Sequence, residues 1–576
     1  MKKILVNISL VSMGMVLLGC GPRFQSREVQ RAPASKNELG VVAQGISLSE
    51  RDTVLKNSNA KFRTVNSKHG LYEFYNVSET ELKTLLPQAK IYSNQFFEFQ
   101  PMVQKLKTDF KMLETHVLKQ SSENETDQRL NPCVRDARMP SNILKLQREG
   151  SQDYEPVGDL LLVERGETLH FMGSDSAPHK DVGGSLKFGF AYVPPEGSLQ
   201  KETIVFSDEL TFAPDAYGPY GLILVVQDKN DVCSMKQVMV GVTGNKPMED
   251  VFEGPAQNLS DFTHLKELNA AEAWEKSTGE NVTVAIIDTG VNYNHPDLSP
   301  NIFINESEVP GNGIDDDGNG YVDDAYGYDF INNDPFPYDD VGHGSHVSGL
   351  TAAASFGMAK NAKILPVKVL GAIGGDLASI VGGVHYAVDS GAQILNMSLG
   401  NYFETPAPEI VESIEYAESK GVLVVAASGN GHPTLGIGLN TDRIPNYPSA
   451  LPNENILSVA AKDSFNALAS YSNYGKDTVD LTAPGGGGEN DPIMSSFLDN
   501  PAELLYLGMS GTSMATPIVS GIAAQVWSLN PTLSALEVKE ILMNSGEEVA
   551  DIKDKTVSGR TINALSAVNY TLQNLP

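Results

Sequence analysis

The stretch LGMSGTSMATPIVSGIAAQVW, residues 507–527, carries the strongest structural signal in this chain of 576 residues. Small residues lead directly into a long apolar run, which predicts a buried helix entered through a tight turn. Ser513 stands at the start of that helix, where backbone N–H groups and the helix dipole stabilise a developing negative charge. A serine in this place is normally only a helix cap. The segments upstream decide between a nucleophile and a cap.

Two upstream segments contain the partners that a nucleophilic serine needs. NVTVAIIDTG, residues 281–290, is an apolar run typical of a buried parallel strand and ends near Asp288. VGHGSHVSGLTAAA, residues 341–354, places His343 between two glycines at the start of a predicted helix. An aspartate that orients an imidazole, which in turn takes the serine proton, makes a catalytic triad. A zinc pair of His343 and His346 is disfavoured because the segment has no HExxH arrangement.

The chain order Asp288, His343, Ser513 and the motifs around these residues resemble the subtilisin-like serine proteases. In that family the first histidine of a His-Gly-Thr-His segment is the general base, which implies this role for His343. Ser345 replaces the threonine and keeps its hydroxyl group. The resemblance covers residues 266–576. It implies an α/β fold with a mainly parallel sheet flanked by helices, and a serine endopeptidase that cleaves extended polypeptides through an acyl-enzyme.

The same resemblance implies an oxyanion donor and a substrate cleft. GVLVVAASGN, residues 421–430, is typical of a buried strand, and the side chain of Asn430 would donate to the oxyanion beside the backbone N–H of Ser513. QILNMSLG, residues 393–400, is similar to the strand that pairs with an extended peptide. Small walls predict a pocket that admits large apolar side chains, with Asn446 as its floor. The expected substrate-binding residues are Ser398, Leu399, Gly400, Ala427, Ser428, Gly429 and Asn446.

An acidic stretch between the Asp288 and His343 blocks predicts a calcium loop. GNGIDDDGNGYVDDAYGYDF, residues 311–330, has oxygen ligands at alternating positions, as in the first part of an EF-hand loop. The twelfth position is Tyr326 instead of glutamate, so another carboxylate must close the site, and Asp324 is a candidate. A solvated acidic turn is the alternative. The expected ligands of a structural Ca²⁺ are Asp315, Asp317, Asn319, the Tyr321 carbonyl and Asp323.

A second acidic pair, Asp339 and Asp340, stands just before His343. Two readings of this pair are open from the sequence, a weaker second ion site and ordinary surface charges. The formal net charge of the whole chain is −30, which repels phosphate backbones and argues against nucleic acid as a partner.

The N-terminus predicts export. A basic start precedes the apolar residues 4–18, which are too few to span a bilayer, and the segment ends in Leu-Leu-Gly-Cys at Cys20. This ending resembles a bacterial lipoprotein signal, which implies cleavage before Cys20 and a lipid anchor in the cell envelope. A plain signal peptide is the alternative. Cys133 and Cys233 remain as an expected disulfide pair, or else as two buried thiols.

The region before the protease-like part predicts two further units. Residues 39–99 alternate strand and helix patterns in the order βαββαβ, the ferredoxin-like plan, with a single last strand at 90–99. Subtilisin-like proteases commonly carry a propeptide of this type as chaperone and inhibitor, so a zymogen is implied, with an unrelated α+β module as the alternative. Residues 131–245 contain short β-rich runs and resemble polycystic-kidney-disease-type, immunoglobulin-like sandwich modules.

A chain of this length needs several cores. The expected units are a lipoprotein signal peptide (1–19), a lipidated tether (20–38), a propeptide-like segment (39–100), a connector (101–130), a β-sandwich (131–245), a linker (246–265) and a subtilisin-like catalytic domain (266–576). We expect a secreted, membrane-tethered monomer, which a cut after the sandwich would release from its anchor; the sandwich between the propeptide-like segment and the protease-like part argues against the usual self-cleavage. The competing function is a lipid-anchored binding or adhesion protein with a silent protease domain.

Overall fold

A computed structural model of the chain describes three regions, which we name the N-terminal segment (40–98), the sandwich segment (140–243) and, after the expectation from the sequence, the catalytic portion (262–574). The positions inside these ranges that it leaves out are 59, 141, 149–153, 158–159, 179–184, 196–197, 202, 231, 372–373, 404, 433–434, 489 and 499–504. The expected signal peptide and tether with Cys20, the connector, Cys133 and nearly all of the linker lie outside the described residues. Within the described residues, no helix is long and apolar enough to span a bilayer.

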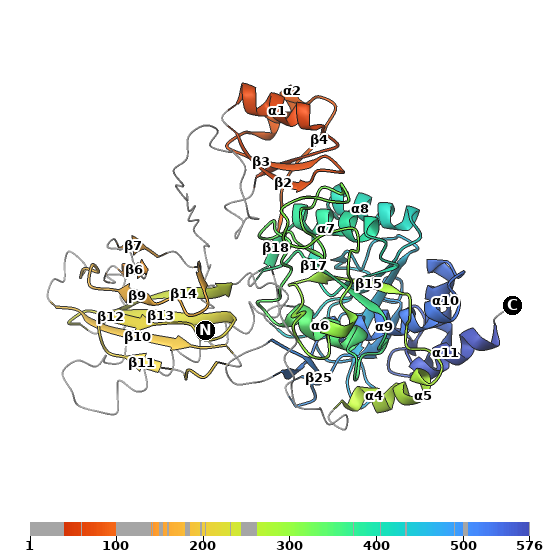
Figure 1. Ribbon diagram of the computed structural model, residues 1–576. Coiled ribbons are helices and arrows are strands. Elements are labelled where there is room, and N and C mark those ends of the chain that lie inside the picture. The colour runs from red at the N-terminus through yellow and green to blue at the C-terminus, as the bar shows by residue number, and fades with distance from the viewer. Residues whose placement is uncertain are drawn as a thin grey trace.

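The catalytic portion is built on a nine-stranded sheet with helices on both faces (Figure 1). Its strands, in spatial order, are β16 (Tyr328–Asp329), β17 (Lys363–Lys368), β15 (Thr283–Asp288), β19 (Ile394–Met397), β21 (Leu423–Ala427), β23 (Ile456–Lys462), β24 (Leu481–Pro484), β28 (Arg560–Thr561) and β27 (Glu547–Glu548). All neighbours pair in parallel except β27 and β28. The expected α/β class with a mainly parallel sheet is confirmed.

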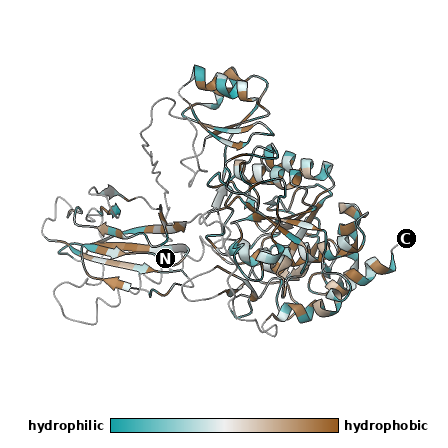
Figure 2. Cartoon of the chain, in the orientation of Figure 1, coloured by the Kyte–Doolittle hydropathy of each residue, from teal (hydrophilic) through white to brown (hydrophobic). Residues whose placement is uncertain are grey.

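Burial on both faces explains why the central strands are apolar throughout. Along β15, Val284 and Ile286 belong to one buried cluster, whereas Ala285 and Ile287 belong to the cluster on the opposite face. The sheet is therefore apolar inside, while the flanking helices carry polar residues outward (Figure 2). The helices of this portion are α4 (Thr263–Glu267), α5 (Ala270–Trp274), α6 (His343–Ala352), α7 (Leu377–Asp389), α8 (Pro408–Ser419), α9 (Thr512–Leu529), α10 (Ala535–Ser545), α11 (Ala564–Gln573) and the 3₁₀ turn η2 (Ser299–Asn301).

The N-terminal segment forms a four-stranded antiparallel sheet in the order β2-β3-β1-β4, with two helices. Its elements are β1 (Val41–Gln44), α1 (Leu48–Asn57), β2 (Lys61–Asn66), β3 (Leu71–Tyr75), α2 (Glu79–Leu85) and β4 (Lys90–Ser93). Helix α1 starts at a capping box of Ser47 and Glu50, and Ser78 caps α2. The segment has its own apolar core and lies against α7 and α8 of the catalytic portion (Figure 1).

The single strand expected at 90–99 is wrong. Strand β4 ends at Ser93, and a separate strand β5 (Phe96–Glu98) leaves the sheet and pairs antiparallel with β18 (Gly374–Asp376) of the catalytic portion. The break falls at Asn94, whose buried side chain donates to both Glu73 and Asp376 at 2.8 Å. Because one of these acceptors belongs to another region of the chain, local periodicity gave no sign of the break.

The sandwich segment consists of two sheets around one apolar cluster. One sheet has the order β11-β10-β13-β14-β8 and the other β12-β9-β6-β7. The strands are β6 (Lys145–Arg148), β7 (Glu155–Pro156), β8 (Leu160–Glu164), β9 (Leu169–Met172), β10 (Lys187–Val193), β11 (Thr203–Val205), β12 (Glu209–Phe212), β13 (Gly218–Gln227) and β14 (Cys233–Thr243). Cys233 is disulfide-bonded. Since Cys133 lies outside the described residues, its pairing with Cys233 stays a prediction.

Candidate active site

The three residues expected to act together all lie at the carboxyl edge of the central sheet. Asp288 is the last residue of β15, His343 is the first residue of α6, and Ser513 lies in the first turn of α9. In a parallel sheet the carboxyl ends of neighbouring strands and the helices that follow them meet at one edge, which is where such folds place their sites.

Asp288 and His343 form a buried ion pair or charge-assisted hydrogen bond. The Nδ1 atom of His343 lies 2.7 Å from Oδ1 of Asp288, and the two side chains are 1% and 0% exposed. The backbone N–H of Thr289 donates to the same carboxylate oxygen at 2.7 Å. A carboxylate accepts, so Nδ1 of His343 carries a proton and Nε2 is the basic nitrogen of the neutral ring.

Ser513 is fixed by a reciprocal pair of hydrogen bonds with Ser398. The Ser513 hydroxyl donates to the Ser398 carbonyl at 3.2 Å, and the Ser398 hydroxyl donates to the Ser513 carbonyl at 3.0 Å. Pro517, four residues further along α9, explains the second bond, because proline has no N–H to offer the Ser513 carbonyl. The Ser513 carbonyl therefore accepts a hydrogen bond from a residue outside the helix instead.

Asn430, the expected oxyanion donor, is oriented by the residue before Ser513. Its side-chain oxygen accepts from both the backbone N–H of Thr512, at 2.8 Å, and the Thr512 hydroxyl, at 2.9 Å. With its oxygen committed to Thr512, the amide N–H₂ group of Asn430 is left to donate elsewhere. Thr512 was not singled out from the sequence, although its place in the Gly-Thr-Ser motif was visible.

Asp339 and Asp340 are neither surface charges nor exposed ion ligands. The Asp339 carboxylate accepts from the Thr289 hydroxyl at 2.9 Å and from the backbone N–H and hydroxyl of Ser345 at 2.7 Å. Burial raises the pKa of Asp339. Asp340 pairs at 2.7 Å with Lys368. The ammonium of Lys368 also donates to the Thr289 carbonyl at 2.6 Å, which holds the backbone next to Asp288.

His346 is a structural histidine. It is fully buried, and its Nε2 atom lies 3.0 Å from the carbonyl oxygens of Ile493 in β25 (Ile493–Ser496) and Leu507 in β26 (Tyr506–Met509). Burial lowers its pKa to about 3, so the ring stays neutral at ordinary pH. His343 is therefore the histidine of this motif that contacts a carboxylate.

The structure brings most of the expected substrate-binding residues together. A β-carbon at Gly400 would lie 2.5 Å from the Asn446 amide nitrogen, which itself donates to the Ala427 carbonyl at 3.1 Å. Gly429 has a φ of +103°, and its missing side chain leaves room for Asn473. The Asn473 amide donates to the Ser428 carbonyl at 2.7 Å and to the Tyr402 hydroxyl, beside the small sheet of β20 (Asn401–Tyr402) and β22 (Asn446–Tyr447), at 2.9 Å. Asn473 and Tyr402 were not predicted and make this region more polar than expected.

Strand β18 is a paired sheet edge that the sequence did not reveal. It precedes α7 and carries β5 as an antiparallel partner. The local signal was weak, since Gly-Gly-Asp before a helix is also an ordinary turn and cap.

The acidic loop gathers a carboxylate cluster that differs from the expected ligand set. Ligand oxygens of Glu308, Asp315 and Asp317 lie within 4.8 Å of one another. Glu308 was not predicted, because it precedes the motif. Its side chain is 6% exposed, and its Oε2 atom has no hydrogen-bond partner among the described residues. Burial raises the pKa of Glu308. A buried carboxylate oxygen beside two others has the chemistry of a hard-cation ligand.

The remaining expected ligands have other contacts. The side chain of Asn319 donates to Asp317 and Asp324, at 3.2 and 3.0 Å. Asp323 accepts from the backbone N–H groups of Asn312 and Gly313, at 2.9 and 3.0 Å, and is not one of the clustered carboxylates. The ring of Tyr321 is buried against Tyr328 and Tyr386. Asp324, the expected closing carboxylate, accepts from the Tyr386 hydroxyl at 2.8 Å through Oδ2, and its buried Oδ1 atom has no hydrogen-bond partner among the described residues.

Comparison with known proteins finds consistent relatives. Residues 279–561 match the model of the subtilase family. The chain is 35% identical over 326 residues to the thermophilic serine proteinase of Bacillus sp. (strain AK1), covering 55% of this chain and 67% of that protein. It is 33% identical over 312 residues to thermitase of Thermoactinomyces vulgaris, covering 53% and 95%. A crystal structure of a cold adapted subtilisin-like serine proteinase aligns with a TM-score of 0.40 and 29% identity, over 50% of this chain and 90% of that one.

Proposed function

This chain belongs to the subtilase family of serine peptidases, and we propose that Asp288, His343 and Ser513 are the residues with which it hydrolyses peptide bonds. The observation that carries the assignment is the buried 2.7 Å contact between His343 and Asp288 at the same sheet edge as Ser513. Subtilisin-like endopeptidase activity follows from the family, and the residue roles are the proposal.

The proposed reaction has two halves. The Ser513 oxygen attacks the carbonyl carbon of the scissile bond while Nε2 of His343 takes its proton, and Asp288 stabilises the imidazolium that forms. The imidazolium then gives this proton to the departing amine, which leaves an acyl-enzyme on Ser513. Water attacks the ester carbon while His343 takes its proton, and the imidazolium then returns this proton to the Ser513 oxygen as the ester C–O bond breaks and the carboxylic acid product leaves.

The developing oxyanion needs fixed donors. We propose the Asn430 amide and the backbone N–H of Ser513 for this role, supported by the two Thr512 contacts that turn the Asn430 oxygen away. Preorganised donors of this kind stabilise the transition state more than the ground state, which raises kcat.

An extended polypeptide fits the cleft by strand pairing. Residues 398–400 supply one backbone edge and β18 supplies another, and the pairing of β18 with β5 supports the second. We assign Ser398, Leu399, Gly400, Ala427, Ser428, Gly429 and Asn446 to substrate binding. Main-chain pairing gives broad sequence tolerance, and the Asn446, Asn473 and Tyr402 groups set the polarity near the residue before the scissile bond.

The N-terminal segment is proposed to act as a propeptide-like inhibitor of ferredoxin-like plan. The support is that β5 already occupies the β18 edge that a substrate needs. The enzyme is then a zymogen until this segment leaves. The sandwich segment is proposed as an immunoglobulin-like spacer, and lipidation at Cys20 as the anchor of an exported, envelope-bound monomer.

A structural Ca²⁺ is proposed in the acidic loop, held by Glu308, Asp315 and Asp317. The fit rests on three converging carboxylates, one with a buried oxygen that no described group satisfies. Asn319, Asp323 and the Tyr321 carbonyl remain proposed contributors on the strength of the loop spacing alone. The ion would neutralise the clustered charge and fix the loop.

Casein hydrolysis by the purified chain tests the proposal. Activity that Ser513→Ala abolishes supports the assignment. The alternative is a lipid-anchored binding protein with a silent protease domain. A correctly folded native chain that is freed of its N-terminal segment and still does not hydrolyse casein would support this alternative.

A further inference from the structure

An arginine of the N-terminal segment lies buried in the surface of the catalytic portion. Arg63, on β2, is 1% exposed, and its Nη2 atom lies 2.9 Å from the Asp376 carboxylate. Its Nη1 atom donates to the Phe330 carbonyl and to the Ser379 hydroxyl, both at 3.1 Å. These three acceptors belong to the catalytic portion, and we call them the Asp376 cradle.

The cradle is organised by the catalytic portion itself. Asp376 is the N-cap of α7 and accepts from the backbone N–H of Ser379 at 3.0 Å and from the Ser379 hydroxyl at 2.7 Å. The Ser379 hydroxyl therefore orients the carboxylate without help from the N-terminal segment. Both oxygens of Asp376 are held in place, and the side chain is fully buried under Arg63. Removing the cation from a buried pair of this kind is strongly destabilising, because it leaves the carboxylate charge uncompensated.

The geometry favours a guanidinium over an ammonium. The planar fork of Arg63 reaches the Asp376 carboxylate, the Phe330 carbonyl and the Ser379 hydroxyl while Nε and Nη2 also contact Glu73 of its own segment, at 3.1 and 2.9 Å. The three donors of a lysine radiate from one atom and cannot span these acceptors. Glu73 presets Arg63, because it is held by the Tyr75 hydroxyl at 2.7 Å.

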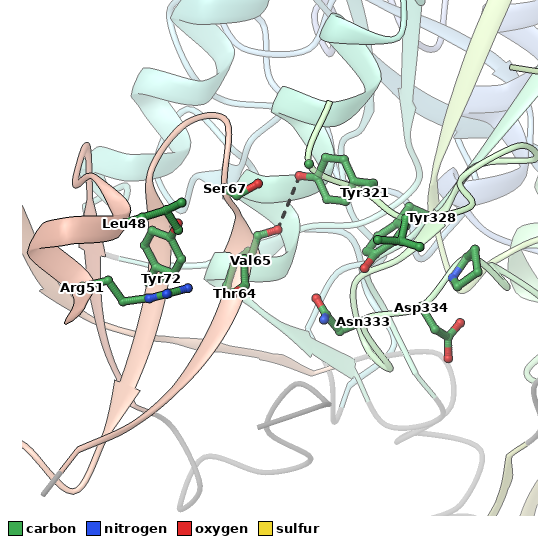
Figure 3. A pocket seen from close by; sticks show the side chains of 13 residues that line it. Leu48, Arg51, Thr64, Val65, Ser67, Tyr72, Tyr321, Tyr328, Asn333 and Asp334 are labelled. Atoms are coloured by element: carbon green, nitrogen blue, oxygen red, sulfur yellow. Dashed lines mark hydrogen bonds between the residues drawn. The ribbon is translucent and has the colours of Figure 1, made fainter. Parts of the chain in front are cut away.

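The contact between the N-terminal segment and the catalytic portion includes a cavity. A cavity of about 330 Å³ separates β2 and α1 of the N-terminal segment from the loop that contains Tyr321 and Asn333 (Figure 3). Across it the Tyr321 hydroxyl donates to the Val65 carbonyl at 3.4 Å, the contact drawn in Figure 3. Apart from this cavity the contact includes apolar packing, because Val42, Val65 and Leu71 belong to the same buried cluster as Phe330. The polar contacts of Arg63 therefore add a directional contact to an interface that apolar burial also stabilises.

We propose that the Asp376 cradle is a guanidinium-binding site of the catalytic portion, filled by Arg63 in the intact chain and by an arginine of the polypeptide substrate once β5 has left β18. Asn94 marks the substrate position. It stands two residues before Phe96, which pairs with Asp376, and its amide already reaches the Asp376 carboxylate at 2.8 Å. A substrate arginine at the matching position reaches the cradle. This second half rests on the proposed function, whereas the first half does not.

The first experiment uses the full chain with Ser513→Ala, so that no proteolysis interferes. The reporters are the backbone N–H groups of Leu377 and Ala378, whose acceptors are the Gln95 carbonyl and the Asn94 side chain of the N-terminal segment. Arg63→Ala should accelerate hydrogen exchange at both about a hundredfold or more, since it leaves buried carboxylates without their cation. Millimolar N-ethylguanidinium should restore slow exchange, and ethylammonium should not.

Arg51→Ala is the matched control, because Arg51 lines the cavity of Figure 3 but pairs with Asp52 and not with the cradle. It should leave both reporters unchanged. Asp376→Asn keeps a capping side chain and should accelerate exchange even if Arg63→Ala does not fold. Three outcomes would overturn the guanidinium site. Exchange at the two reporters is unchanged in Asp376→Asn, exchange in Arg63→Lys is as slow as in the native chain, or ethylammonium restores slow exchange as well as N-ethylguanidinium does.

The second experiment profiles cleavage of a peptide library by Arg63→Ala with Ser513 intact. Arginine should be enriched at one fixed position upstream of the scissile bond, and Asp376→Asn or citrulline at that position should reduce the preference at least tenfold. Enrichment that survives Asp376→Asn, or cleavage without any arginine preference, contradicts the substrate half. A complete lack of cleavage contradicts the proposed function instead, and the exchange experiment still decides the site.

Discussion

Two buried carboxylates of the catalytic portion have cationic or proton-donating partners, and the two partnerships differ in what surrounds them. Asp288 contacts His343 within the catalytic portion alone, at the edge of a sheet that has a buried apolar cluster on each face. Asp376 contacts Arg63 between two regions of the chain, which also share the buried apolar cluster that contains Val65 and Phe330. The contact of Asp288 therefore fixes the orientation of the His343 ring, whereas the contact of Asp376 docks one region of the chain on another.

Loss of the nucleophile should give the largest effect and leave the docking contact untouched. Ser513→Ala should reduce kcat/KM for a peptide substrate by about 10⁶-fold, because the acyl-enzyme cannot form. Its thermal midpoint and the exchange at Leu377 should match the native chain. A fall of less than about a hundredfold would show that another group is the nucleophile.

Loss of the oxyanion donor should also be confined to the interior site. Asn430→Ala should lower kcat by about 10²- to 10³-fold with little change in KM, since the donor acts mainly in the transition state. Thr512→Ala is the control: it retains the backbone contact to Asn430 and should cost less than the Asn430 change. A change in KM alone would contradict the assignment.

Calcium removal should reach both regions, because the acidic loop contacts the N-terminal segment through Tyr321 and Val65. An ion present at a hundred times its Kd stabilises the fold by about 2.7 kcal/mol, so chelation should lower the thermal midpoint by about 5 °C or more. Glu308→Gln should remove most of the response to added Ca²⁺ in a calorimetric titration. Asp323→Asn, outside the cluster, should change it less. Equal effects would favour the ligand set expected from the loop spacing.

Acid should weaken the docked region through His385. The centroid of this ring, on α7, lies 4.2 Å from that of His69 in the N-terminal segment and 4.7 Å from that of Tyr416, and the Asp389 carboxylate lies 2.7 Å from the His69 ring. Burial lowers the pKa of His385 to about 4, against an ordinary value of 6.5. As pH falls, the His385 ring binds a proton in the unfolded chain at a higher pH than in the folded chain. Its neutral, buried form therefore contributes fully to the free energy of unfolding above pH 6.5, and this contribution is lost progressively between pH 6.5 and 4.

His385→Gln should accordingly flatten the fall of the thermal midpoint between pH 7 and 5, by a few degrees at most. His264→Gln, in the interior of the catalytic portion, is the matched control, since burial lowers the pKa of His264 to about 3 without a partner from the other region. It should act on global stability without changing exchange at Leu377. If both variants change that exchange equally, His385 does not act specifically on the docking of the N-terminal segment.

The sequence predicted those features of the fold and the site that depend on short stretches of neighbouring residues. Apolar runs located the central strands, and the motifs around Asp288, His343 and Ser513 placed these residues at strand ends and helix starts, which the structure bears out. Small residues such as Gly400 predicted the walls of a pocket, although not that Asn473 and Tyr402 lie beside it.

What the sequence missed depends on contacts between distant residues. Glu308 joins the acidic cluster from outside the motif, β5 leaves its expected sheet because β18 offers an edge, and the Asp339–Asp340 pair is buried because Lys368 and Thr289 meet it there. Periodicity contains no information about such pairings. The same holds for Arg63, which has the local pattern of an ordinary strand residue.

Covalent labelling with phenylmethanesulfonyl fluoride, followed by peptide mass spectrometry, tests the central claim most directly. The reagent sulfonylates a serine that a neighbouring base activates, and fluoride leaves. We expect a single adduct, on Ser513, whose yield parallels the loss of peptidase activity and which disappears in His343→Ala. Inactivation with the adduct on a different serine, or labelling of Ser513 that persists in His343→Ala, would contradict the proposed catalytic residues.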